Sequence, residues 1–137
     1  MALTAAFDME TRQYDIINAF ANAKLPKPLL CQCAKGYKKE NILLWVSQAL
    51  YGLKTSPLYW YKALTATLGD LGLELVLGTN CLFVNKWLML IFYVDDFLIV
   101  YQSKDQVYFN EFEKKLLDWY DFWALGEAEH FLRICII

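Results

Sequence analysis

The most apolar block of the chain surrounds a pair of carboxylates. Residues 88–101 are apolar except for Asp95 and Asp96, and they include neither glycine nor proline. Branched aliphatic and aromatic residues on both sides of such a pair are typical of strands that are buried on both faces. The block therefore predicts a β-hairpin with two adjacent carboxylates at its turn. It is too short and too charged for a membrane span, which takes ~20 apolar residues.

The remaining strands are predicted from short apolar segments and, over residues 10–17, from a loose alternation of polar and apolar residues. Prolines at positions 26 and 28 force extended chain and so separate a helical turn from the strand that follows. We expect that turn over residues 18–23, a loop over residues 35–41 and the tail of a helix over residues 1–9. The predicted strands cover residues 10–17, 29–33, 42–46, 81–85 and 130–137.

Two helices are predicted from apolar residues that recur every three or four positions. Ser56 is the expected N-cap of the first helix, with Pro57 at its first helical position. Residues 103–106 form a capping box that opens the second helix. Both apolar stripes are expected to face the core. The first stripe consists of Tyr61, Leu64, Leu68, Leu71 and Leu75. The second consists of Tyr108, Phe112, Leu116, Trp119 and Trp123.

The order of these elements is strand, insert, helix, hairpin, helix, strand. This order predicts an α+β fold in which the helices pack on one face of a mostly antiparallel sheet. A chain of 137 residues is expected to form a single domain.

Composition limits the class of protein. Aromatic residues make up 17% of the chain, which is rich for a free-standing domain and indicates surface that faces another domain or subunit. The four cysteines show no zinc-site spacing, and no signal peptide is visible. We therefore expect free thiols in an intracellular protein.

Charge is unevenly distributed although the net charge is only −2. Residues 12–62 have eight basic and two acidic residues, whereas residues 63–137 have five basic and eleven acidic residues. The basic part includes a lysine cluster that could follow a phosphate backbone, and a solvated loop is an equally open interpretation. The cluster consists of Lys24, Lys27, Lys35, Lys38 and Lys39.

A third carboxylate, Asp15, lies near the end of the first predicted strand. If that strand lies beside the hairpin, Asp15, Asp95 and Asp96 converge at one edge of the sheet. Carboxylates are hard oxygen ligands that suit Mg²⁺, and two such ions could support a phosphoryl transfer. An ordinary polar hairpin tip is the other interpretation that the residues leave open.

Four blocks of sequence resemble one known family. Residues 93–96 (YVDD) are similar to the YxDD box of reverse transcriptases. Residues 49–61 (ALYGLKTSPLYWY), 14–20 (YDIINAF) and 125–132 (LGEAEHFL) resemble blocks of the copia-type retrotransposon polymerases, in the family's order. The resemblance implies a single reverse-transcriptase palm domain over residues 1–137, with fingers, thumb and RNase H absent.

The resemblance implies an RNA-directed DNA polymerase that adds deoxynucleotides to a primer 3′-hydroxyl with two Mg²⁺ ions. Its implied partners are an RNA or DNA template with primer, deoxynucleoside triphosphates and the rest of a polyprotein, with no membrane. Asp15 and Asp95 would be the principal metal ligands, supported by Asp96 and by the carbonyl of Ile16.

Further roles follow from the same resemblance. The amides of Asn18 and Ala19 would meet the triphosphate, and Phe20 would exclude a sugar 2′-hydroxyl. Tyr51 and Gly52 would line the nucleotide pocket. The residues that would place the primer end are Tyr93 and Val94.

The chain departs from the family pattern at Gln48, Leu58, Asn80 and Arg133, and Leu58 stands where a basic residue is usual. By family the chain is an enzyme, but alone it is expected to be incomplete. The alternatives are a catalytically inactive remnant or a nucleic-acid-binding module with the same fold. A metal-dependent hydrolase is a further alternative that leaves the block at residues 49–61 unexplained.

Overall fold

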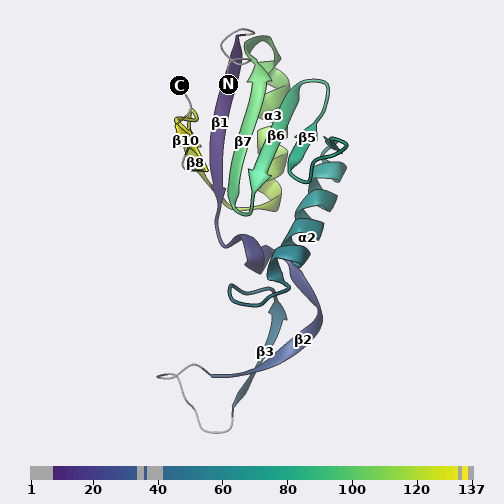
Figure 1. Cartoon of the computed structure of the whole chain (residues 1–137), viewed down its shortest axis with the longest axis vertical. Coiled ribbons are helices and arrows are strands. Elements are labelled where there is room, and N and C mark those ends of the chain that lie inside the picture. The colour runs from purple at the N-terminus through teal and green to yellow at the C-terminus, as the bar shows by residue number, and fades with distance from the viewer. Residues whose placement is uncertain (1–7, 34–35, 37–41, 133, 136–137) are drawn as a thin grey trace.

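The structure, a computed structural model, describes residues 8–33, 36, 42–132 and 134–135. A six-stranded antiparallel sheet forms the body of the molecule, in the order β4-β5-β6-β7-β1-β8 (Figure 1). The α+β class and the antiparallel sheet are therefore confirmed. The strands of this sheet are β1 (Met9–Ile16), β4 (Glu74–Leu75), β5 (Leu82–Val84), β6 (Leu88–Tyr93), β7 (Asp96–Gln102) and β8 (Phe122–Gly126).

Two further strand pairs lie outside this sheet, β2 (Lys24–Gln32) with β3 (Leu43–Gln48) and β9 (His130–Phe131) with β10 (Ile134–Cys135). The helices are α2 (Ser56–Asp70) and α3 (Gln106–Trp119), with short 3-10 turns η1 (Ala19–Asn22) and η2 (Ser103–Asp105). In the part of the chain that these elements cover, no helix is both long and apolar enough to cross a lipid bilayer.

The β2–β3 ribbon projects beyond one end of the sheet (Figure 1). It leaves large apolar side chains in solvent, with Leu30, Leu43 and Trp45 exposed by 59%, 57% and 66%. The expectation that apolar surface of this chain faces another domain stays a prediction, and these are the side chains to which it applies.

Both helices contribute to a core on one face of the sheet, as predicted. On β7, Phe97, Ile99 and Tyr101 belong to this core, which also contains residues of α2 and α3. The alternate residues Leu98 and Val100 pack on the other face, in a smaller cluster with residues that follow β8. Burial on both faces explains why the hairpin is apolar at every position rather than at alternate ones.

The first helix differs from its prediction at both ends. Its N-cap is Thr55 rather than Ser56, because the Ser56 hydroxyl donates instead to Leu50 O at 2.6 Å. It ends at Asp70, and Leu75 lies exposed in β4 rather than on the buried stripe. A glycine at position 72 with a φ of 83° turns the chain before the periodic pattern runs out.

The second helix keeps the predicted period but shifts its face. Its buried residues are Phe109, Phe112 and Leu116, whereas Tyr108 and Trp119 are 45% and 55% exposed. The predicted capping box is wrong, because Asp105 is the N-cap and makes no side-chain cap bond. The Gln106 side chain accepts a hydrogen bond from the Tyr101 hydroxyl at 2.8 Å instead. Trp123, predicted on this helix, lies in β8.

The chain ends also differ from prediction. Met9 begins β1, so the predicted helix tail is wrong at this residue, and residues 1–7 lie outside the described part. Among its described residues, the strand predicted over 130–137 is divided into β9 and β10, because Leu132 takes a φ of 52° and the two short strands pair antiparallel; residues 136 and 137 lie outside the described part. Outside the described residues lie the predicted loop (apart from Gly36), Lys35, Lys38, Lys39 and Arg133.

A buried hydroxyl pair joins α2 to the end of α3. Thr67 Oγ1 donates to Ala63 O at 3.1 Å and lies 2.8 Å from the Tyr120 hydroxyl. The Thr67 hydroxyl has only one hydrogen, which it donates to Ala63 O. The hydrogen bond between the two hydroxyls is therefore assigned with Tyr120 as the donor and Thr67 as the acceptor. Tyr120 also packs edge-on against Trp60, with ring centroids 5.2 Å apart.

We predict that Thr67→Val destabilises the chain more than Tyr120→Phe does. Thr67→Val leaves a buried phenol donor without a partner, which costs about 2 kcal/mol of unfolding free energy. Tyr120→Phe removes only the bond itself, about 1 kcal/mol, since Thr67 keeps its bond to Ala63. Urea unfolding of both variants measures the difference, and equal losses would contradict the assigned donor direction.

Candidate active site at the hairpin turn

The two parts of the predicted site meet through the pairing of β1 with β7. Asp15 lies directly opposite Asp96 in this pair, and Asp96 lies opposite Tyr93 of β6. Directly opposed residues of neighbouring strands point to the same face of a sheet. The three side chains therefore form a row on the face that turns away from the helices. Tyr14 and Ile16, the neighbours of Asp15 in β1, pack in the helix-side core.

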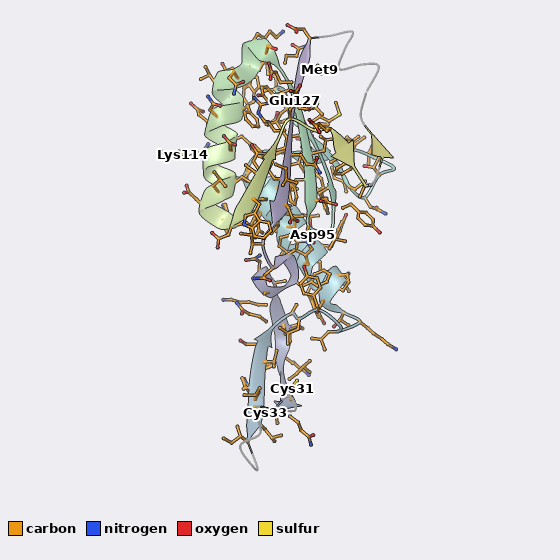
Figure 2. The ribbon with its side chains drawn as sticks, turned by 90° about the vertical axis from the view of Figure 1, so that its left-hand side faces the viewer. Met9, Cys31, Cys33, Asp95, Lys114 and Glu127 are labelled. Atoms are coloured by element: carbon orange, nitrogen blue, oxygen red, sulfur yellow. The ribbon has the colours of Figure 1, made fainter. Side chains whose placement is uncertain are left out.

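The hairpin turn consists of Val94 and Asp95, and Figure 2 shows Asp95 at the end of the sheet nearest the β2–β3 ribbon. The prediction that both carboxylates occupy the turn is wrong for Asp96, which begins β7 because it pairs with Tyr93 and Asp15. Val94 has a φ of 58°, a backbone conformation that is strained for a β-branched residue.

Two hydrogen bonds hold this strained turn. Trp60 Nε1 of α2 donates to Val94 O at 2.7 Å, and the backbone N–H of Ile16 donates to Asp95 O at 2.9 Å. Trp60 is only 2% exposed. The turn is thus anchored both to the helix-side core and to the strand that bears Asp15.

The carboxylates of the site repel one another. Partial burial and the Asp95 carboxylate raise the pKa of Asp15 above its ordinary value. Partial burial, Asp95 and Asp15 together raise the pKa of Asp96. Shifts of this origin mark like charges that a bound cation would relieve.

The oxygen atoms of these carboxylates suit a hard divalent cation as ligands. They do not form a complete metal-binding cluster, because no three carboxylate, histidine or cysteine side chains among the described residues lie close enough together to hold one ion. Pairing therefore brings Asp15 and Asp96 together and places Asp95 in the next turn, without completing a preformed metal site.

The predicted sugar-side residues Phe20 and Tyr51 are in contact. Their ring centroids are 4.5 Å apart, and Phe20 is 8% exposed while Tyr51 is 59% exposed. Partial burial and the nearby carboxylates Asp95 and Asp15 raise the pKa of Tyr51, so its hydroxyl lies within electrostatic range of the site. Gly52 follows with a φ of 94°, which suits glycine.

The remaining predicted residues lie around η1. Asn18 precedes it with a φ of 52°, and neither its amide nor that of Ala19 donates to a backbone oxygen in the described part of the chain. Ala19 itself is fully buried. A cavity of about 230 Å³ reaches from Phe20 to Tyr93 and Val94, so η1 adjoins the hairpin turn.

Two residues of the site were missed at the level of sequence. Trp60 lies in the motif block at residues 49–61, but nothing in its spacing identifies Val94 as its hydrogen-bond acceptor. Trp123 is 63% exposed and lies directly opposite Asp15 in the pairing of β1 with β8. Only the register of β8 shows this, because the sequence pattern placed Trp123 on a helix.

Comparison with known proteins gives consistent matches. The family model described as "Reverse transcriptase (RNA-dependent DNA polymerase)" matches residues 1–137. The chain is 26% identical over 145 aligned positions to the retrovirus-related Pol polyprotein from transposon TNT 1-94 of Nicotiana tabacum, covering 100% of the chain and 11% of that protein.

Yeast proteins match as well. The chain is 31% identical over 94 residues to the truncated transposon Ty1-A Gag-Pol polyprotein of Saccharomyces cerevisiae, covering 68% of the chain and 8% of that protein. The match to the transposon Ty1-DR5 Gag-Pol polyprotein is equally similar and covers 5% of it. These matches confirm the copia-type resemblance, and the chain spans about a tenth or less of these relatives.

Backbone strain at Val94 leads to a stability prediction. We expect Val94→Gly to be more stable than Val94→Ala by about 1 kcal/mol, because both lose the side-chain packing and only glycine relieves the positive φ. At Val84, in β5, the order should be the reverse, with glycine about 0.5–1 kcal/mol less stable than alanine. Thermal unfolding of the four variants tests this, and the same order at both sites would contradict strain at the turn.

Repulsion between the paired carboxylates leads to a prediction about pH. Without added metal, Asp15→Asn should raise the unfolding free energy at pH 7 by about 0.2–1 kcal/mol, since it removes a like charge directly opposite Asp96. A carboxyl whose pKa is raised by folding binds its proton more tightly in the folded state. The wild-type chain therefore regains stability as the pH falls through that raised pKa.

The advantage of Asp15→Asn should accordingly disappear at pH 3, where the carboxylates are protonated. Glu74→Gln on the edge strand β4 removes an exposed charge far from the pair and serves as the control. Urea unfolding at both pH values measures the effect. A gain that is as large at pH 3 as at pH 7 would show that repulsion is not its source.

Proposed function

The chain belongs to the reverse transcriptase (RNA-dependent DNA polymerase) family, and from this premise we propose that it is the palm of a copia-type retrotransposon polymerase. Its reaction would be the addition of deoxynucleotides to a primer 3′-hydroxyl. The observation that carries the proposal is the register of Asp15 opposite Asp96, with Asp95 in the adjoining turn. Because the chain spans 5–11% of its relatives, the activity of the whole protein belongs to the proposal.

In this proposal Asp15 and Asp95 hold two Mg²⁺ ions, and Asp96 and the Ile16 carbonyl support them. The ions would supply positive charge at the reacting phosphate and its oxygens. The raised pKa values of Asp15 and Asp96 favour such a role, because burial and neighbouring carboxylates cause both shifts and a shared cation would offset that repulsion.

The residues of the turn would position the primer. Tyr93, 60% exposed, offers a ring beside the carboxylates. The hydrogen bond from Trp60 to Val94 O holds the turn in a fixed position relative to α2. A rigid turn favours catalysis because phosphoryl transfer depends mainly on positioning and charge.

On the nucleotide side, the amides of Asn18 and Ala19 would meet the triphosphate. Phe20 would exclude a 2′-hydroxyl, with Tyr51 and Gly52 lining the pocket. Because the Tyr51 ring lies against Phe20, the two rings would together form the sugar side of the pocket.

The proposed partners are an RNA or DNA template with its primer, deoxynucleoside triphosphates and the rest of a polyprotein. Several relatives are Gag-Pol polyproteins by name, which supports the last of these. Lys24 and Lys27 are exposed on the ribbon and would face phosphates. An intracellular location is part of the same proposal.

A nucleic-acid-binding module without turnover is the second candidate. Two observations favour it, the lack of a closed metal-ligand cluster among the described residues and the exposed Leu58 at a usually basic position. The two candidates share the fold and differ in whether the carboxylates support chemistry.

Primer extension on an RNA template distinguishes the candidates. With Mg²⁺, and with the flanking coding sequence restored, we expect extension that Asp95→Asn lowers by about 100-fold or more. Removal of Mg²⁺ by EDTA should abolish it, and Asp118→Asn on the outer surface of α3 should leave it unchanged. Nucleic-acid binding without any extension would favour the binding module and contradict a polymerase.

A further inference from the structure

The exposed indole of Trp123 extends the row of side chains that contains the carboxylates. Asp15 pairs with Asp96 on one side and with Trp123 on the other, while Tyr93 pairs with Asp96. The order across β6, β7, β1 and β8 is therefore aromatic, carboxylate, carboxylate, aromatic. Neighbouring strands lie ~4.8 Å apart, so the two rings leave the sheet about 14 Å from each other.

The neighbour of Trp123 shows to which face the indole belongs. Phe122 packs edge-on against Tyr14 with ring centroids 5.9 Å apart, and it contacts the helix-side core. Alternate residues of a strand point to opposite faces, so Trp123 shares the open face with Asp15. An indole exposed by 63% at this place makes no contribution to the core.

We propose that Trp123 stacks on a nucleobase of the nucleic acid bound over the carboxylates. The proposal rests on the function proposed above and adds a contact on the β8 side of the site. A flat indole face binds any base by stacking, and exposed aromatic rings beside a backbone-binding surface are a common means of holding single strands. Tyr93 is the corresponding ring at the other end of the row, exposed by 60%.

Charge along the row favours a base rather than a phosphate at Trp123. Asp15 lies next to the indole and repels phosphate groups, whereas a neutral base avoids this repulsion. A strand that crosses the row would thus present its bases to the rings, and its phosphates would approach only where Mg²⁺ screens the carboxylates.

The test is equilibrium binding of a fluorescein-labelled primer–template with a single-stranded template overhang to the 137-residue chain in Mg²⁺ buffer. Trp123→Ala should weaken binding about tenfold, the effect of losing one stacked base. Trp123→Phe keeps an aromatic face and should retain most of the affinity. Trp119→Ala is the matched control, because Trp119 is 55% exposed at the end of α3 and away from the row.

Tryptophan emission supplies a second readout that a purely structural role would not move. Binding should quench emission in the wild type and in Trp119→Ala, whereas Trp123→Phe should bind with much less quenching. Trp123→Ala with wild-type affinity would overturn the proposal and leave the polymerase function standing. A wild-type chain that binds no primer–template would also overturn the stacking proposal, whereas the polymerase function is decided by primer extension with the flanking coding sequence restored. Circular dichroism of each variant confirms that the comparison is made on folded protein.

Discussion

The pairing of β1 with β7 is the constraint on which the rest of the structure depends. It sets two carboxylates directly opposite each other, which is unfavourable in isolation. The register is nevertheless fixed, because Phe97 and Ile99 are buried on the helix side while Leu98 and Val100 are buried on the other. A shift by one residue would exchange these faces along the whole strand. Burial of the hairpin thus holds Asp15 and Asp96 together against their repulsion.

A second unfavourable feature lies two residues before Asp96, and buried contacts maintain it as well. The positive φ of Val94 persists because Trp60 binds its carbonyl, and Trp60 is packed in turn against Tyr120. Tyr120 is tied to α2 through Thr67. A chain of buried contacts therefore runs from the two helices to the turn, as expected where strain is maintained at a functional site.

The sequence was informative where local pattern and tertiary environment agree. The hairpin was predicted because apolar runs rich in branched and aromatic residues strongly favour buried strands, and the first strand was predicted from a loose alternation of polar and apolar residues. The order of these elements and the two helices gave the α+β class. The prediction failed for Trp123, since its spacing of four residues from Trp119 imitates a helical stripe. In the structure Tyr120 already takes an extended backbone, with φ −139° and ψ 148°, and β8 forms by pairing with β1. Strand pairing is a long-range effect that no local pattern specifies.

Two of the departures from the family pattern, Leu58 and Asn80, lie outside the buried core. Leu58 is 51% exposed in the first turn of α2, so the loss of a basic residue there leaves the core intact. Its neighbour Pro57 lines the cavity that includes Val94, and Asn80 lines the same cavity. Both departures therefore lie at the edge of the proposed site rather than in the fold. Changes at such positions alter contacts with a bound partner, whereas changes at Trp60 or Ile16 would act on the turn itself.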